Sequence, residues 1–418
     1  MMNMNLPVSY RKVGDTSHFL NYTTGRIMSF TDSDANFLIN NLERLQNDSD
    51  WADIIDQEVR DFFSENLHKI NSRRFRPSLL ELGMTFSFPT IVNVELNRRC
   101  SLTCHHCYIP VADLKSPVHS FFESLSDEKV QDLLSSLCEL GIFLIVLTGG
   151  EVFLNKRLQF FLQETSKRNL IVEIFSNLQF LPDWFENINP YETKVGRIQT
   201  SIYSVVPEVH DQIVQHKGAF QNTLNNLLTL RAKGYHVEIA TPLMSLNFDG
   251  RYETEKFFMD LDIPHSFAWP IVNEYYDPQL KSKSSLNISK EQFLQFCLEK
   301  PDFLIEINPL TNGQNSICAA GKSLFAISAD GSVFPCSQYP KLIGNVALSN
   351  LKQLFNSSEM AAIRNSKMLD IPEDSYKYNY CMGNNFSETG DPFKQADFIK
   401  NILDYYEKHT NEAKMEMI

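Results

Sequence analysis

The sequence predicts an α/β protein whose central part is a parallel β-sheet covered by helices. Between about residues 88 and 272, apolar β-rich runs alternate with amphipathic segments, a pattern typical of repeated strand–helix units. The length of 418 residues and the 43% apolar content are sufficient for two or three globular domains. The six expected strands are Thr90–Leu96, Phe143–Leu147, Ile171–Phe175, Arg197–Tyr203, His236–Thr241 and Ser266–Pro270.

Two of the expected helices have recognisable ends. The segment Ser126–Leu140 begins with a residue type that caps helix N-termini and stops before Gly141. The segment Gln221–Lys233 has leucines on helical spacing and stops before Gly234.

Three cysteines, Cys100, Cys104 and Cys107, follow the first expected strand with Cys-x3-Cys-x2-Cys spacing. Three thiolates in one loop can bind three irons of a [4Fe–4S] cubane and leave the fourth iron open to a small molecule. The spacing alone leaves two alternatives. Structural zinc usually takes four ligands in paired Cys-x2-Cys units, and no second pair lies nearby. Cysteine is also a common buried residue, so the second alternative is that the three cysteines are grouped by chance.

Polar and glycine residues follow three further expected strands. Thr148-Gly149-Gly150-Glu151 follows the second strand, Ser176-Asn177 the third, and Ser201 and Tyr203 end the fourth. Two glycines allow a close approach of the backbone to a ligand, although a Gly-Gly pair after a strand is most often only a turn. The carboxyl ends of parallel strands meet at one edge, where active sites of such folds gather. The inference therefore depends on all these motifs sharing one edge with the cysteines.

Composition and charge exclude several classes of function. The net charge of −13 speaks against nucleic-acid binding, which requires a basic face. The local basic cluster of Arg73, Arg74 and Arg76 is expected to be a solvated linker. The start of the chain does not resemble a signal peptide, and the longest apolar stretch, around Ile142–Leu147, is too short to span a bilayer. The eight cysteines are therefore expected in a reducing compartment, the cytoplasm, where metal binding or catalysis is more common for cysteine than disulfide formation.

Together these motifs resemble the radical S-adenosylmethionine (SAM) superfamily. Cys100, Cys104 and Cys107, followed by Tyr108, resemble its cluster motif, and the segment Gly149–Glu151 resembles the one that meets the methionine amino group. Val152 stands where proline is usual. The resemblance implies a partial (β/α)6 TIM-like barrel and reductive cleavage of SAM to a 5′-deoxyadenosyl radical. The cofactor contacts that it implies are Tyr108, Gly149, Gly150, Glu151, Ser176, Asn177 and Ser201.

The C-terminal part resembles the SPASM/twitch extension, which carries auxiliary iron–sulfur clusters. Cys318, Gly331 and Cys336 match the opening of its pattern, and Cys381 lies in the segment that supplies later ligands. Tyr378 stands where similar sequences often have another cysteine. Three cysteines are too few for two clusters. We expect one auxiliary cluster with an open iron or a borrowed ligand, and the alternative is a degenerate tail that binds no metal. Cys138 and Cys297 are expected to be buried apolar residues, the alternative being a hydrogen donor.

The first 70 residues differ in character from the barrel. Tyr10–Val13, His18–Asn21 and Arg26–Phe30 are expected strands, with a turn at Thr24-Gly25, and two helices follow, from Asp32 or Ser33 and through Trp51–Phe63. This arrangement resembles the winged-helix-like PqqD peptide-recognition element, which adds a leader peptide to its sheet edge. A winged-helix DNA binder and a purely structural cap are the alternatives.

The resemblance divides the chain into three parts. These are a peptide-recognition domain (1–85), a radical SAM barrel (86–290) and a cluster-binding domain (291–418). The implied function is radical modification of a ribosomally made precursor peptide, by crosslinking or other C–H activation. The implied partners are the precursor peptide, bound through its leader, and an electron donor such as a flavodoxin or ferredoxin. Modification of a protein or small molecule, and a catalytically dead leader-binding protein, are the alternatives.

Overall fold

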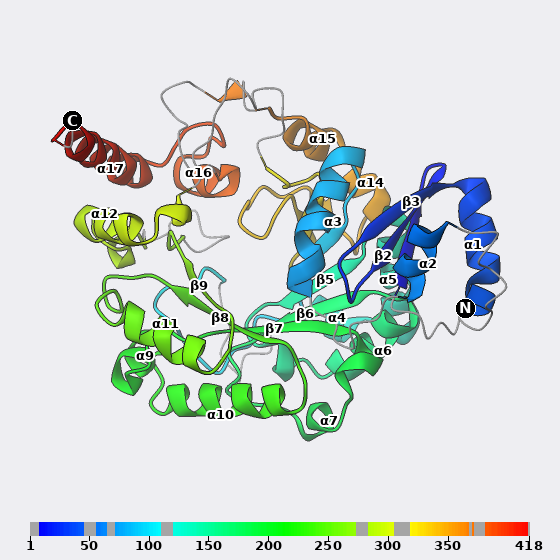
Figure 1. Cartoon of the computed structure of the whole chain (residues 1–418), viewed down its shortest axis with the longest axis horizontal. Coiled ribbons are helices and arrows are strands. Elements are labelled where there is room, and N and C mark those ends of the chain that lie inside the picture. Colours follow the sequence, from blue (N-terminus) through cyan, green and yellow to red (C-terminus); the bar gives the residue numbers. More distant parts are fainter. Residues whose placement is uncertain are drawn as a thin grey trace.

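A nine-stranded sheet forms the centre of the computed structural model (Figure 1), with the strand order β12-β11-β10-β4-β5-β6-β7-β8-β9. The structure describes residues 8–45, 56–64, 72–109, 120–272, 283–304, 318–367, 370–371 and 381–416. Six consecutive strands pair in parallel. They are β4 (Ile91–Glu95), β5 (Leu144–Thr148), β6 (Ile171–Phe175), β7 (Val195–Ser201), β8 (Val237–Pro242) and β9 (His265–Ala268). The six expected strands are thus confirmed, with ends shifted by two residues or fewer.

Helices cover the outer face of these six strands. The larger ones are α5 (Asp127–Leu140), α6 (Leu158–Lys167), α9 (Pro207–Val214), α10 (Ala219–Ala232) and α11 (Arg251–Asp260). Shorter segments are α4 (Phe121–Ser124), η2 (Val152–Leu154), α7 (Asp183–Glu186) and α8 (Pro190–Thr193). The expected helix ends are confirmed: the Ser126 side chain accepts from the Lys129 N–H, and Gly141 ends α5 with a φ of 103°. Every residue of β5 is buried, as a strand covered on both faces requires.

The N-terminal part is an antiparallel sheet in the order β1-β2-β3, followed by helices. Its elements are β1 (Val8–Val13), β2 (Thr16–Asn21), β3 (Ile27–Thr31), α1 (Asp32–Leu45), α2 (Gln57–Ser64) and α3 (Ser72–Phe86). The three strands and both expected helices are confirmed where the structure describes them; Trp51 lies outside the described residues. The winged-helix identity stays a prediction.

The expectation of a linker at Arg73–Arg76 is wrong, because these residues belong to α3. This helix packs against the inner face of the sheet, where Phe75 and Leu79 join a buried cluster with Phe143 and other strand residues. The Arg76 guanidinium lies 2.7 Å from the fully buried carboxylate of Glu173 on β6. The charge of Arg76 is therefore paired with the carboxylate of Glu173 inside the barrel, although the neighbouring arginines in the sequence suggested an exposed position.

The C-terminal part continues the same sheet. β10 (Leu324–Ile327) pairs in parallel with β4, with Leu324 opposite Ile91, and β11 (Ser332–Phe334) and β12 (Gly344–Asn345) follow antiparallel. The remaining elements are η3 (Ser284–Leu286), α12 (Lys290–Glu299), η4 (Pro301–Phe303), α14 (Leu351–Phe355), α15 (Ser358–Arg364), α16 (Met382–Thr389) and α17 (Asp397–Glu416). The expected domain boundaries stay predictions. Across the described residues, no helix is both long and apolar enough to cross a membrane.

Candidate functional site

The cysteine loop that follows β4 lines a cavity of about 410 Å³ at the carboxyl ends of the parallel strands. Cys100, Cys104 and Cys107 all contribute to its wall. Every expected cofactor contact other than Glu151 also lies in this wall, which contains Tyr108, Gly149, Gly150, Ser176, Asn177 and Ser201. Residues from β4, β5, β6 and β7 thus converge at one edge of the sheet, as the sequence predicted.

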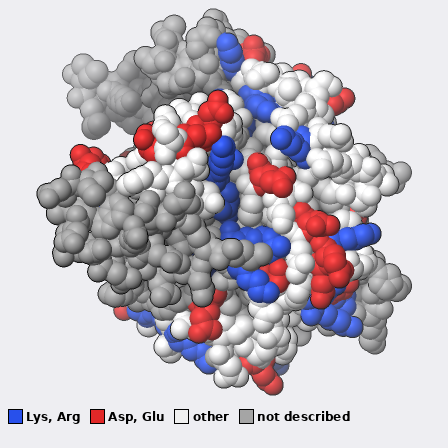
Figure 2. Space-filling model, turned by 90° about the vertical axis from the view of Figure 1, so that its right-hand side faces the viewer, with Lys and Arg blue, Asp and Glu red and all other residues white. Residues whose placement is uncertain are grey.

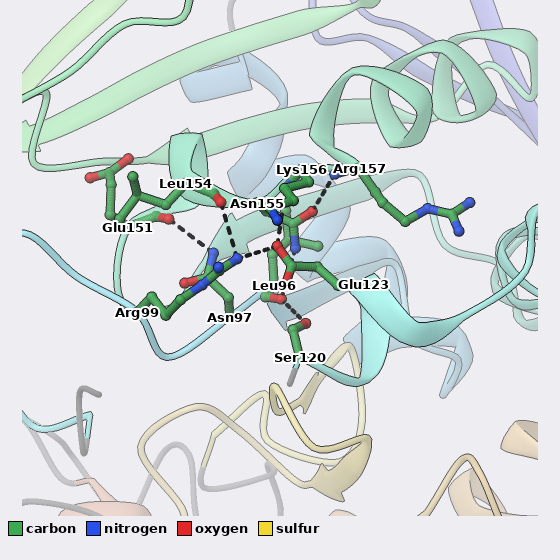
Figure 3. A network of polar contacts seen from close by, with 10 residues as sticks. All are labelled: Leu96, Asn97, Arg99, Ser120, Glu123, Glu151, Leu154, Asn155, Lys156 and Arg157. Carbon is green, nitrogen blue, oxygen red and sulfur yellow. Dashed lines mark hydrogen bonds and ion pairs between the residues drawn. The ribbon is translucent and has the colours of Figure 1, made fainter. Parts of the chain in front are cut away.

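A network of polar contacts holds the backbone that precedes the cysteines (Figure 3). The Arg99 guanidinium bonds the Glu123 carboxylate and the Leu154 carbonyl oxygen, the latter at 3.2 Å. The Leu96 carbonyl oxygen accepts from the Ser120 hydroxyl and from the Asn155 side-chain amide. The charge of Arg99 is therefore used in anchoring the loop, and Arg99 is not among the described residues that line the cavity.

Gly149 and Gly150 allow the loop after β5 to lie directly against the loop after β4. The Gly150 N–H donates to the Asn97 carbonyl oxygen at 2.8 Å, and the Glu151 N–H donates to that of Arg99 at 2.7 Å. A Cβ at Gly149 would lie 2.3 Å from the Asn97 oxygen, and one at Gly150 would lie 2.3 Å from the Arg99 oxygen. Gly149 also has a φ of 129°, which L-residues rarely adopt. The lack of side chains at both glycines thus allows the two loops to contact each other through their backbones, and the same residues form part of the cavity wall.

The Glu151 carboxylate lies behind the cavity wall and bonds to the protein. It accepts from the Ser176 hydroxyl at 2.8 Å, from the Asn177 N–H at 2.8 Å and from the Phe153 N–H at 2.9 Å. Burial raises the pKa of Glu151, and these three donors favour the charged form. The side chain therefore ties the end of β5 to the end of β6. Direct contact of Glu151 with a cofactor stays a prediction.

The donors around the three thiols fit an iron–sulfur cluster. The Cys100 sulfur accepts from the Leu102 N–H and from the Asn177 side-chain amide, both at 3.4 Å. Burial raises the pKa of Cys100 to about 11 and raises that of Cys104 further, with the neighbouring cysteines adding to the effect. Three such thiolates require a bound cation to coexist, which iron supplies. A cubane spreads its ligands over separate irons, whereas zinc needs four ligands on one ion.

Two histidines that the sequence analysis did not assign, His106 and His210, lie in the wall beside the cysteines together with Tyr203, which was expected at this edge. The Tyr203 hydroxyl lies 3.0 Å from Nε2 of His106, and the Tyr203 N–H donates to Nδ1 of His210 at 3.3 Å. Burial lowers the pKa of both histidines to about 4, so both imidazoles are neutral near pH 7. The contact joins the cysteine loop to the end of β7.

The three C-terminal cysteines lie near one another in a different setting. Cys318 and Cys336 pack against an apolar cluster that includes Tyr339 and Met382. Burial raises the pKa of Cys318 to about 12 and that of Cys336 to about 11, and the charge of Cys381 contributes to both shifts. The antiparallel hairpin of β10 and β11 lies between Cys318 and Cys336 in the sequence and brings the chain back toward Cys318. Tyr378 lies outside the described residues.

Gln338, which the sequence analysis did not single out, connects the two cysteine groups. It lines the main cavity, its N–H donates to the Cys336 sulfur at 3.4 Å, and its side-chain oxygen lies 3.9 Å from the Cys381 sulfur. It also lines a second cavity of about 180 Å³, together with Cys381. The C-terminal part therefore closes one side of the main cavity.

Comparisons with known proteins agree with this geometry. Residues 94–258 match the radical SAM superfamily, and residues 318–385 match the SPASM iron–sulfur cluster-binding domain. The chain contains a radical SAM domain and a SPASM domain. A radical SAM domain implies a [4Fe–4S] cluster and SAM, and a SPASM domain implies auxiliary iron–sulfur clusters. All eight cysteines are free thiols, as ligand roles require.

Relatives include proteins of peptide maturation and of nucleotide chemistry. The subtilosin biosynthesis protein AlbA of Bacillus subtilis is 26% identical over 302 residues, which cover 69% of this chain and 64% of AlbA. The GTP 3′,8-cyclase of Aquifex aeolicus is 23% identical over 59% of this chain and 81% of the cyclase. The crystal structure of Streptococcus suis SuiB covers 94% of this chain and 98% of SuiB, with a TM-score of 0.58 and 13% identity, which establishes similarity of fold.

Proposed function

We propose that this chain is a radical SAM enzyme that modifies a ribosomally made precursor peptide. The observation that carries the proposal is the convergence of Cys100, Cys104 and Cys107 on one cavity with the residues that end β5, β6 and β7. The similarity to AlbA, whose name places it in the biosynthesis of the bacteriocin subtilosin, supports a peptide as the substrate.

In this proposal the three cysteines bind the cluster and the remaining wall binds SAM. When bound, the reduced cluster supplies one electron that cleaves the carbon–sulfur bond of SAM and yields a 5′-deoxyadenosyl radical. The amide of Asn177 donates to the Cys100 sulfur and stabilises its charge. Gly149, Gly150, Ser176 and Ser201 form part of the wall that would meet the cofactor.

We further propose that Cys318, Cys336 and Cys381 bind one auxiliary cluster. Their mutual electrostatic influence and their place beside the main cavity support this role. Crosslinking must transfer an electron from the substrate to an acceptor, so a retained auxiliary cluster favours crosslinking over a redox-neutral modification. Reduction of the first cluster requires an electron donor such as a flavodoxin or ferredoxin.

The N-terminal part offers a groove for the leader peptide, in keeping with a PqqD-like role. A cavity of about 590 Å³ lies between the β3 segment Arg26–Ser29, Glu58 of α2 and the α3 residues from Ser78 to Phe86. β3 is an edge strand of its sheet, so a peptide can pair with it in the way that sheet-edge recognition requires. On the face in Figure 2, a line of Lys and Arg side chains runs beside groups of Asp and Glu, and this mixed charge suits a peptide better than a DNA backbone.

Anaerobic reconstitution tests the proposed activity. The reconstituted chain should release 5′-deoxyadenosine from SAM with dithionite as reductant, and should change the mass of a peptide encoded by a short reading frame beside its gene. Deoxyadenosine release without any peptide product would favour another substrate. Absence of deoxyadenosine from iron-loaded protein would favour a catalytically dead binding protein.

A second experiment tests leader binding separately. Phe86 is 52% exposed and lines the groove, so Phe86→Ala should weaken binding of the leader peptide about 10-fold, the loss expected for one aromatic contact. Met259 on α11 is 67% exposed and does not line this groove, so Met259→Ala is the matched control. Equal leader affinity in both variants and the unmodified chain would contradict this site.

A further inference from the structure

The three cysteines of the C-terminal part leave one iron of a cubane without a thiolate ligand. Cys318, Cys336 and Cys381 are the last three of the eight cysteines in the chain, whereas a [4Fe–4S] cluster has four irons. The cysteine that precedes them, Cys297 of α12, packs in a separate apolar cluster with Phe293 and other residues. The fourth iron therefore either stays open or takes a ligand of another kind.

Each of the three sulfurs accepts from the backbone N–H of a residue two or three positions further along the chain. The donor and acceptor pairs are Gln338 with Cys336 at 3.4 Å, Asn384 with Cys381 at 3.5 Å, and Ala320 with Cys318. In the first group the Leu102 N–H has the same relation to the Cys100 sulfur. Such donors favour the charged thiolate, so the surroundings of the C-terminal cysteines fit metal ligation.

A buried methionine lies beside these thiols. The thioether sulfur of Met382 is 4.0 Å from the Cys318 sulfur. Met382 follows Cys381 directly, is the first residue of α16 and is 2% exposed. It belongs to the apolar cluster against which Cys318 and Cys336 pack. The charges of Cys336 and Cys381 both contribute to the raised pKa of Cys318, so all three thiols lie in the region that holds the thioether.

Two side-chain oxygens are the competing donors in this region. The Gln338 side-chain oxygen lies 3.9 Å from the Cys381 sulfur. The Asn384 side-chain oxygen is buried and has no hydrogen-bond partner in the part of the chain that the structure describes. Amide oxygens are hard donors that suit magnesium and calcium, whereas soft thiolate and thioether sulfurs suit iron–sulfur clusters. The Met382 sulfur is therefore the better match to the fourth iron.

We propose that Met382 is the fourth ligand of the auxiliary cluster, with its thioether sulfur bound to the iron that Cys318, Cys336 and Cys381 leave free. The inference rests on the auxiliary cluster of the proposed function and identifies its remaining ligand. Ligation forms one iron–sulfur bond and transfers neither a proton nor an electron, because a thioether is a neutral donor. A cluster with four protein ligands has no open iron for the substrate, so its role is electron transfer.

The full-length chain with Cys100→Ala, Cys104→Ala and Cys107→Ala isolates the auxiliary cluster for a test that does not depend on turnover. Reconstituted without oxygen, this parent chain should bind about four irons. Cyanide is the probe for an open iron, and its binding is followed by the electron paramagnetic resonance signal of the reduced cluster. Met382→Leu in the parent chain removes the sulfur and nearly conserves the volume of the side chain. It should bind cyanide at least about 10-fold more tightly, because no tethered ligand competes for the iron.

A second variant keeps a sulfur at the same position. Met382→Cys replaces a neutral donor by a thiolate, so it should retain the iron and shift the midpoint potential to more negative values. This variant also keeps the proposal testable if Met382→Leu does not fold.

Two controls separate ligation from packing. Met360→Leu makes the same change at a fully buried methionine of α15 that belongs to the barrel core, and it should alter neither cyanide affinity nor potential. Asn384→Leu removes the competing oxygen and should also leave both quantities unchanged.

The outcomes distinguish this inference from the proposed function. Equal cyanide affinity in Met382→Leu and the parent chain, or an unchanged potential in Met382→Cys, would overturn the assignment of Met382. Tighter cyanide binding after Asn384→Leu, but not after Met382→Leu, would also overturn it and assign the iron to the amide oxygen. A parent chain that binds no iron would instead refute the auxiliary cluster itself.

Discussion

The two groups of three cysteines in this chain differ in what surrounds them. Cys100, Cys104 and Cys107 lie in one loop and line a cavity of about 410 Å³. Cys318 and Cys336 pack into an apolar cluster, and only Cys381 reaches the smaller second cavity. The first group therefore leaves room for a molecule next to its metal, whereas protein encloses most of the second. These settings fit the two roles that we propose: a site that binds and cleaves a cofactor, and a site that accepts electrons.

The largest expected effect separates these roles at the first group. Cys104→Ala should reduce 5′-deoxyadenosine formation below detection, because the variant cannot hold three irons of a cubane. Leader affinity should not change, since the groove beside β3 is formed by other residues. Chromatographic quantification of deoxyadenosine, with iron analysis, is the measurement. Turnover equal to that of the unmodified chain would refute the cluster assignment.

A smaller effect on SAM cleavage is expected from the second group. Cys336→Ala should stop formation of the peptide product while retaining part of the deoxyadenosine release, because the first cluster stays bound. Mass spectrometry of the peptide and deoxyadenosine yield, measured on the same samples, give the ratio of uncoupled to productive cleavage. A variant that changes neither quantity would mean that the tail holds no working cluster.

The buried carboxyl group of Glu95, at the end of β4, should make the free energy of unfolding depend on pH. Burial raises the pKa of Glu95 to about 7, against the charge of Arg98 and the N–H of Ala329. A carboxyl whose folded pKa is raised binds more protons folded than unfolded, so stability falls as pH rises from about 4.5 to about 7. Glu95→Gln removes the ionisable group, so the variant should not lose stability in this way. The stability of the variant relative to the unmodified chain should therefore rise by about 3 kcal/mol from pH 5 to pH 8.

Denaturant unfolding at several pH values measures this difference. The charge of Glu95 also contributes to the raised pKa of Tyr108, which lines the main cavity. The ionisation of Glu95 is therefore linked to the candidate site. Stability curves of the variant and the unmodified chain that stay parallel across this pH range would show that Glu95 is ionised at no cost.

The smallest expected effect concerns the carboxylate that joins β5 to β6. Glu151→Gln keeps the shape of the side chain but replaces one acceptor oxygen by an NH2 group, which cannot accept from Ser176 or Asn177. SAM affinity should fall about 10- to 100-fold, the usual range for residues that orient a metal site. Calorimetry with SAM measures it. Gly250→Ala is a structural control, because a Cβ there meets only the Ser204 hydroxyl oxygen at 3.6 Å. Unchanged SAM affinity in Glu151→Gln would assign Glu151 no positioning role.

The comparison also explains what the sequence could predict. Strands β4 to β8 are mostly buried and rich in apolar residues, and the first cysteine group is a local pattern within one loop. Both are therefore visible without a structure. Strands β10 to β12 have four, three and two residues, too few for a reliable pattern. The pairing of Leu324 with Ile91 joins segments far apart in the chain, so no local signal indicates that the tail extends the barrel sheet.

Residues that act through distant partners were also missed or placed wrongly. Arg76 looked like part of a solvated linker because its partner Glu173 is 97 residues away. The contact of Glu151 with the cofactor stays a prediction, and nothing in the sequence indicated that its carboxylate also bonds residues that end another strand. Gln338 belongs to no sequence motif, and it reaches the cavity wall only because the C-terminal part closes one side of the cavity. In each case the missing information is which strand ends meet in space.

The most direct test of the central claim isolates the first cysteine group. The chain with Cys318, Cys336 and Cys381 all replaced by alanine, reconstituted without oxygen, should bind about four irons per chain and show an electron paramagnetic resonance signal when reduced. Addition of SAM should change that signal, because SAM would bind beside the iron that has no protein ligand. Zinc in place of iron, or a signal that SAM leaves unchanged, would contradict the account.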